Sequence, residues 1–315
     1  MRHGKEIYLF FGIYGVNGII GIIVYKTLNI ANKSKVQNYG EFVNQLSKNK
    51  KTNEIIKIIV NIFLLLSFYV MIAGFSAYFS QELGIPNIVG TTVIIILCYT
   101  IFMGNIEEII KVNTILIPML ILFILILITK NIDAYQNINQ KMQETSIIKS
   151  ILSAILYSSY NSITLIPMII SLKKYLKNKK QIKIVSILVV VGLIILAIAI
   201  FGLIQKVDLD INKIELPTVY VAGMSGKIYK YLYGGIILVA IFTSAISAGY
   251  SILENYILKP KKYKKIAISL CASAILVSKI GFSTLINLLY PVFGILGIIQ
   301  IILIMKTQSN SKKIY

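Results

Sequence analysis

The segment Leu156–Pro167 (LYSSYNSITLIP) places hydroxyl and amide groups where the surrounding chain is apolar. An unpaired hydroxyl or amide in hydrocarbon costs a few kcal/mol, so these side chains must avoid lipid. They either bond neighbouring helices or line a cavity that binds a polar solute. Pro167 removes a backbone donor just beyond them, which favours a helix that unwinds near the membrane midplane and offers backbone groups to a ligand. The candidate binding residues are Tyr157, Ser158, Ser159, Tyr160 and Asn161.

Two further polar positions fall among apolar residues. Glu6 is the acid expected at membrane depth, where an acid is a functional candidate by default, able to bind an amine or carry a proton. Its alternatives are neutralisation by Lys5 or a neighbouring helix, or a place among the lipid headgroups. Ser76 lies in the segment MIAGFSAY, where core packing and a role in the binding site are equally plausible.

The sequence offers no pattern for enzymatic chemistry. It has no zinc-binding His/Glu spacing, no Cys/His pairing and no phosphate-binding glycine loop, so we expect neither an enzyme nor a protein with a cofactor or metal. Glu107 and Glu108 adjoin an expected cytoplasmic turn, where they are more simply solvated. Cys98 and Cys271 fall inside apolar segments and are expected to be buried structural thiols.

The composition defines the setting of these residues. Of the 315 residues, 57% are hydrophobic and only 14% are charged, well below the roughly 25% of an average soluble domain. The chain is therefore expected to be an integral membrane protein. Its formal charge of +20 comes from lysines in short loops, without a basic face carrying interleaved aromatics. The expected partners are thus the lipid bilayer and a small-molecule solute, not nucleic acid.

Apolar runs between polar residues predict nine membrane spans and one half-span. The lysine-rich loops alternate strictly with lysine-poor ones, which places the rich set and the C-terminus in the cytoplasm. One missed helix would break that alternation. We expect the membrane to be the inner (plasma) membrane. The half-span covers Glu6–Tyr14, and the spans cover residues 17–31, 57–80, 87–104, 112–130, 147–172, 184–205, 229–256, 266–282 and 284–305.

Four blocks of this sequence resemble, in order, the YkvI family of bacterial membrane proteins. They are GKEIYLFFGIYGVNG, MIAGFSAYFSQELGIPNIVG, ILYSSYNSITLIP and LINLLYPVFGILG. That family is similar to the amino acid, polyamine and organocation transporter superfamily, whose fold is the five-plus-five inverted repeat of LeuT type. The resemblance implies an all-α polytopic bundle in one transmembrane domain, with residues 1–130 as the first repeat and 147–306 as the second.

The first helix departs from the family pattern. A glycine-rich break expected before the Gly-x-Glu-Ile segment survives only as Gly4, so the first helix looks incomplete. Three explanations stay open: the true start lies upstream, the chain is a degenerate copy, or residues 6–31 form one tilted span that begins outside.

The resemblance implies a secondary active transporter of an amino acid or amine-like solute, coupled to Na⁺ or H⁺ and working by alternating access. Gly4 and Glu6 would face the polar segment across the solute, and Ser76 would lie on a helix that lines the site. The alternative is a non-transporting sensor, such as a germinant-receptor-like subunit on the same scaffold. Hard cations prefer oxygen ligands, and the implied ion ligands are Thr243, Ser244 and Ser247. Close packing of these small residues against a neighbouring helix is the equally supported alternative.

Overall fold

The computed structural model describes residues 27, 39–46, 49–104, 107–132, 156, 159, 166, 178–204, 214–256 and 259–311. These residues form helices, turns and short connections, and no strand occurs among them. They belong to two compact units. The first unit holds the described residues within 64–143 and 198–288, and the second holds those within 13–63, 144–197 and 289–315.

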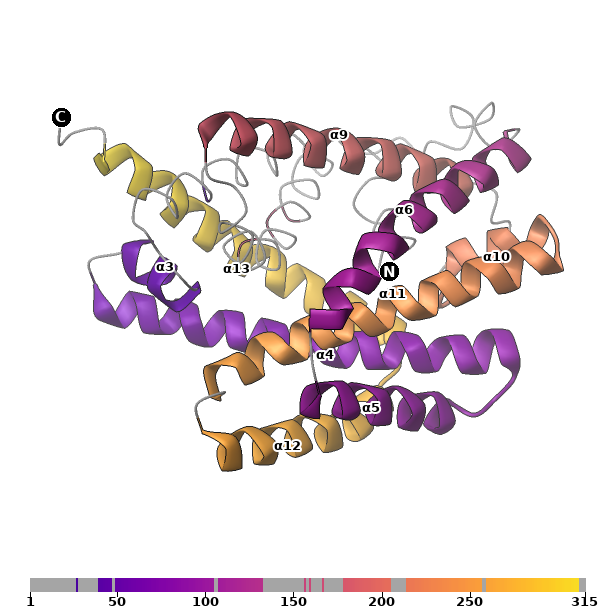
Figure 1. Cartoon of the computed structure of the whole chain (residues 1–315), viewed down its shortest axis with the longest axis horizontal. Coiled ribbons are helices and arrows are strands. Elements are labelled where there is room, and N and C mark those ends of the chain that lie inside the picture. The colour runs from indigo at the N-terminus through magenta and orange to yellow at the C-terminus, as the bar shows by residue number, and fades with distance from the viewer. Residues whose placement is uncertain are drawn as a thin grey trace. The chain divides into compact units, whose positions relative to one another are not determined.

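Figure 1 shows the helices, and their bounds follow the apolar runs of the sequence. Two short helices were not predicted: α3, before the first long helix, and α10, which begins at Pro217 in a segment expected to be a loop. Proline is suited to the first turn of a helix because its missing N–H would be unbonded there. The bounds are α3 Tyr39–Leu46, α4 Lys50–Leu83, α5 Asn87–Met103, α6 Glu107–Lys130, α9 Lys179–Ile204, α10 Pro217–Met224, α11 Lys227–Leu253, the 3₁₀ turn η4 Glu254–Tyr256, α12 Pro260–Ser278 and α13 Phe282–Ser311.

Helices of membrane-spanning length confirm that the protein is a helical membrane protein. In the described part of the chain, three helices or helix segments are long and apolar enough to cross a bilayer: Lys50–Leu83, Val112–Lys130 and Lys227–Leu253. A fourth candidate is the pair Pro260–Ser278 and Phe282–Leu289, which is bent by 101°. The expected spans at 17–31 and 147–172 lie outside the described ranges apart from single residues, so the count of nine stays a prediction.

The first unit is packed closely through glycines. α5 lies against α12 and α11, and α11 also contacts α6 and α10 (Figure 1). A Cβ on Gly90 of α5 would come within 2.9 Å of the Ser76 Cα, and one on Gly249 of α11 would collide with Phe102. Helices approach this closely only where the side chain is a hydrogen atom. The apolar runs therefore fold into an interior with specific contacts.

Two hydrogen bonds join helix ends that the lysine pattern predicts on the same side of the membrane. Tyr263, at the start of α12, donates its hydroxyl proton to the Phe102 carbonyl at the end of α5, with 2.8 Å between the oxygens. Beyond the end of α6, Asn131 Nδ2 donates to Ser225 Oγ, just before α11, at 2.8 Å. The pairing of these ends agrees with the predicted alternation, and which side faces the cytoplasm stays a prediction.

Candidate functional site

Two residues of the polar segment 156–167 lie with their backbone against α13 in the second unit. Leu156 and Ser159 are helical, and Ser159 is 1% exposed. A Cβ on Gly297 would collide with the carbonyl of Ser159, and one on Gly294 would come within 3.1 Å of the Leu156 carbonyl oxygen. Ser159 therefore lies inside the protein, and Leu156, which is partly exposed, has its backbone beside α13.

Gly294 and Gly297 were missed as site residues by the sequence analysis. Their spacing of three residues puts both on one face of α13, and small residues on one face of a helix let a neighbouring backbone approach closely. That spacing was visible in the block LINLLYPVFGILG and could have been used. The predicted solute ligands Gly4, Glu6, Tyr157, Ser158, Tyr160 and Asn161 lie outside the described residues.

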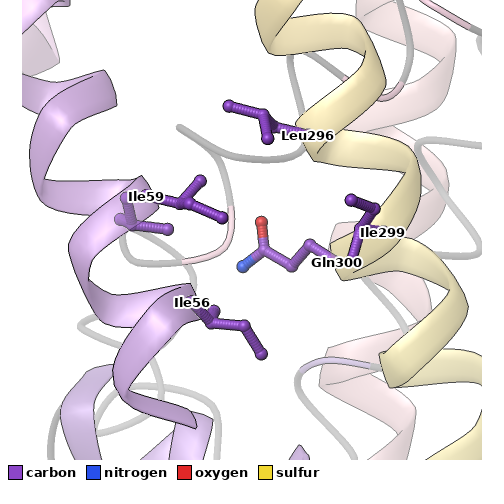
Figure 2. A pocket seen from close by; sticks show the side chains of 6 residues that line it. Ile56, Ile59, Leu296, Ile299 and Gln300 are labelled. Carbon is purple, nitrogen blue, oxygen red and sulfur yellow. The ribbon is translucent and has the colours of Figure 1, made fainter. Parts of the chain in front are cut away.

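A small pocket adjoins this contact in the second unit. Figure 2 shows the Gln300 amide on α13 pointing toward isoleucines of α4 across the opening. Gln300 is 3% exposed and follows Gly297 by three residues. Nearby, Phe63 of α4 and Phe293 of α13 pack edge to face with their centroids 4.4 Å apart. The pocket is lined by Ile56, Ile59, Val60, Leu296, Ile299 and Gln300.

The three predicted ion ligands lie together on α11 and bond to their own helix. Thr243 and Ser244 both donate to the Ala240 carbonyl, at 3.2 and 2.7 Å, and Ser247 donates to the Thr243 carbonyl at 2.8 Å. Thr243 is buried, whereas Ser244 and Ser247 are exposed. A hydroxyl that donates its proton still has lone pairs available for a cation. This arrangement does not test the predicted role.

Ser76 is held by α5. It is 2% exposed, and its hydroxyl donates to the Asn87 carbonyl at the start of α5, at 2.6 Å. A buried carbonyl or hydroxyl without a hydrogen-bond partner would destabilise the fold. The bond therefore stabilises the contact between α4 and α5. Ser76 thus has a structural role, and its proposed contact with a solute stays a prediction.

The first unit also contains a charged network that the sequence analysis did not identify. At the end of α4, Gln81 Nε2 donates to Glu82, and the Glu82 carboxylate pairs with Lys230 Nζ of α11 at 2.8 Å. The side chain of Glu82 is 4% exposed and that of Lys230 is 30% exposed. An ion pair buried this far is retained only where the geometry and further hydrogen bonds offset desolvation.

The same network holds the start of α13. Glu215 donates its backbone N–H to Gln81 Oε1 at 2.6 Å, and the Glu215 carboxylate accepts from both the N–H and the hydroxyl of Ser283. Ser283 lies two residues after Gly281, whose φ of +88° turns the chain between α12 and α13. A carboxylate at a helix N-terminus is stabilised by the unpaired N–H groups there. Glu215 therefore links Gln81, near the end of α4, to Ser283, next to the bend between α12 and α13.

These features define the protein as a helical membrane protein with buried polar residues between its helices. No family model matches the chain. The chain is 25% identical over 304 residues to "Uncharacterized membrane protein YkvI" of Bacillus subtilis (strain 168). The match covers 92% of this chain and 86% of that protein, so it extends over nearly the whole membrane domain. The protein is accordingly similar to a YkvI membrane protein.

Proposed function

We propose that this membrane protein is a secondary active transporter of a small solute, an amino acid or amine, with a LeuT-like inverted repeat in the inner membrane and its C-terminus in the cytoplasm. The observation that carries the proposal is the contact between Gly297 of α13 and the backbone of Ser159. Ser159 belongs to the polar segment 156–167, and a polar, discontinuous helix near the membrane midplane is the usual place for a solute site in such transporters.

The proposed solute site combines Tyr157–Asn161 with Gly4, Glu6 and Ser76. Amide and hydroxyl groups can bind the polar ends of a zwitterion, and Glu6 would bind its ammonium group or carry a coupled proton. The resemblance to transporters of amino acids and polyamines supports this class of solute.

The coupling ion is proposed to be Na⁺, with protons as the alternative. Thr243, Ser244 and Ser247 offer three hydroxyl oxygens within five residues of α11, and hard cations prefer oxygen ligands. Because each hydroxyl already donates to a carbonyl, its oxygen is oriented by the helix.

The central test is uptake of a mixture of radiolabelled amino acids and polyamines into proteoliposomes. We expect Asn161→Ala to abolish uptake with an unchanged amount of protein in the membrane. Asn287→Ala, an exposed asparagine on α13, is the matched control and should transport normally. Normal uptake by Asn161→Ala would move the solute site elsewhere.

Two further measurements identify the coupling ion and distinguish a transporter from a sensor. Replacing external Na⁺ with K⁺ should stop uptake, and an unchanged rate would favour proton coupling. Binding of the labelled solutes to the purified protein without any flux would contradict transport and favour a sensor.

A further inference from the structure

The first two turns of α12 carry a dense group of exposed lysines. The helix begins at Pro260, contains no acidic residue and has no side-chain cap at its first turn. One of the lysines, Lys262, lies over the ring of Tyr256 with 5.0 Å to the centroid. None of the group forms an ion pair with a carboxylate in the part of the chain that the structure describes. The lysine group consists of Lys259, Lys261, Lys262, Lys264 and Lys265.

The lysine group continues into an exposed apolar stripe. At 100° per residue, Lys261, Lys265 and Ile268 share one face of α12, and Ala272 and Leu276 extend that face toward the other end. Ile268 is 53% exposed and Leu276 is 69% exposed. The opposite face is buried and packs in the first unit; it consists of Ala267, Leu270, Cys271, Ala274 and Ser278.

Such a stripe has a defined position in a bilayer. Large exposed apolar side chains on a membrane helix contact acyl chains, so Ile268 and Leu276 lie at hydrocarbon depth. Lys265 is three residues before Ile268, or about 4.5 Å along the axis, which brings its ammonium to the headgroup phosphates.

The charge of the lysine group indicates the chemistry of its binding partner. The N-terminus of a helix carries a partial positive charge, so five lysines beside the first turn of α12 repel both it and one another. In the described part of the protein no carboxylate forms an ion pair with these lysines. Anionic headgroups at the level of the lysines would offset the repulsion, and they also match the unpaired N–H groups of the first turn.

We propose that the lysine group of α12 is a docking surface for anionic phospholipid headgroups, with the acyl chains lying along Ile268, Ala272 and Leu276. The lipid holds this end of α12 at the membrane surface. The proposal does not depend on the transport function.

The absence of tryptophan from the sequence makes a direct test possible. Ile268→Trp introduces a single tryptophan beside the lysine group on the full chain, at an exposed site. Its emission can be excited selectively over that of the tyrosines. After reconstitution, quenching by brominated phosphatidylglycerol is compared with quenching by brominated phosphatidylcholine. The ratio of the two lipid affinities at this position is the quantity measured.

The lysine variant carries Lys261→Gln, Lys264→Gln and Lys265→Gln in the reporter background. Each lysine near an anionic surface contributes a factor of about five, or about a hundredfold for three, so a fall of the preference for phosphatidylglycerol by at least about tenfold is the expected result. The control removes three exposed lysines outside the group, Lys130→Gln, Lys227→Gln and Lys279→Gln, and should keep the preference. Equal preferences in the two variants would overturn the proposal.

Two further measurements use the Ile268→Trp protein with its lysine group intact. They test the proposal even where the lysine variant does not fold. Raising KCl should lower the preference steeply because headgroup contacts are screened, and a preference that ignores salt would overturn the proposal. Inorganic phosphate should displace the lipid no better than chloride of equal ionic strength. Specific displacement by phosphate would assign the surface to a free anion and overturn the lipid assignment.

Discussion

Glu82 and Lys230 form a 2.8 Å ion pair whose two partners differ in their access to water. The Glu82 side chain is 4% exposed and the Lys230 side chain 30% exposed. A lysine can extend its ammonium to the headgroups when its partner is removed, but a buried carboxylate cannot follow. The ion pair therefore joins α4 to α11, and the buried Glu82 is the partner that cannot move to water when the pair is broken.

The first prediction concerns the loss of either partner. Lys230→Gln leaves the Glu82 carboxylate buried and unpaired, which should destabilise the protein by about 3–5 kcal/mol. Glu82→Gln should cost less, and the double variant should recover part of the stability lost in Lys230→Gln. Thermal unfolding in detergent measures these differences. Lys57→Gln, which breaks the exposed pair with Glu54, is the control and should cost at most about 1 kcal/mol. Equal losses for the two buried-pair variants would contradict this asymmetry.

The second prediction concerns Gly297. Alanine at this position meets the Ser159 carbonyl, so Gly297→Ala should destabilise the protein by about 1–3 kcal/mol through overpacking. Gly235→Ala on α11 is the matched control, because nothing lies within 4 Å of its added Cβ and alanine favours a helix. We expect the control to be neutral or slightly stabilising in the same unfolding experiment. A stable Gly297→Ala protein would show that α13 does not touch the polar segment.

The third prediction concerns the bend between α12 and α13. Glu215→Ala removes both bonds to Ser283, whereas Ser283→Ala removes only the hydroxyl bond. Hydrogen exchange of the Ser283 amide should therefore be fastest in Glu215→Ala, because its N–H has lost its acceptor. The amide of Ser273, in the middle of α12, should exchange equally slowly in both variants. Equal protection of Ser283 in both variants would mean that Glu215 does not hold the bend.

The fourth prediction tests the orientation. In a background without Cys98 and Cys271, both buried, single cysteines replace Lys262 or Lys279 at opposite ends of α12. Lysine-rich loops face the cytoplasm, so in intact cells an impermeant maleimide should label Lys279→Cys and not Lys262→Cys. The reverse result would invert the predicted topology.

Much of the fold could be predicted because apolar runs and helices coincide. The expected span 87–104 corresponds to α5 at Asn87–Met103, and 112–130 lies within α6. The helices begin earlier than expected where lysines continue the helix past the apolar run, as at Lys50 and Lys179. Hydropathy does not register that continuation because lysine forms helices well.

The contacts of the candidate site were less predictable. A buried charge pair such as Glu82–Lys230 joins residues far apart in sequence, and nothing local marks one loop charge as buried and another as exposed. The closeness of Gly297 to Ser159 likewise depends on which helices are neighbours. The hydroxyls of α11 were identified as a group, and their bonds to the backbone are those that an isolated helix would also make.

The length of α4 has a consequence for where its first turns lie. At about 1.5 Å per residue, its 34 residues extend about 51 Å, whereas the hydrocarbon core measures about 30 Å. Even at a tilt of about 40°, near the upper limit for membrane helices, only about 26 residues fit within the core. About eight residues must stand outside it, which is the length of the lysine-bearing stretch 50–57. Those turns reach beyond the hydrocarbon core, and they stay part of the packed protein there, because Asn53 and Ile56 are each only 5% exposed.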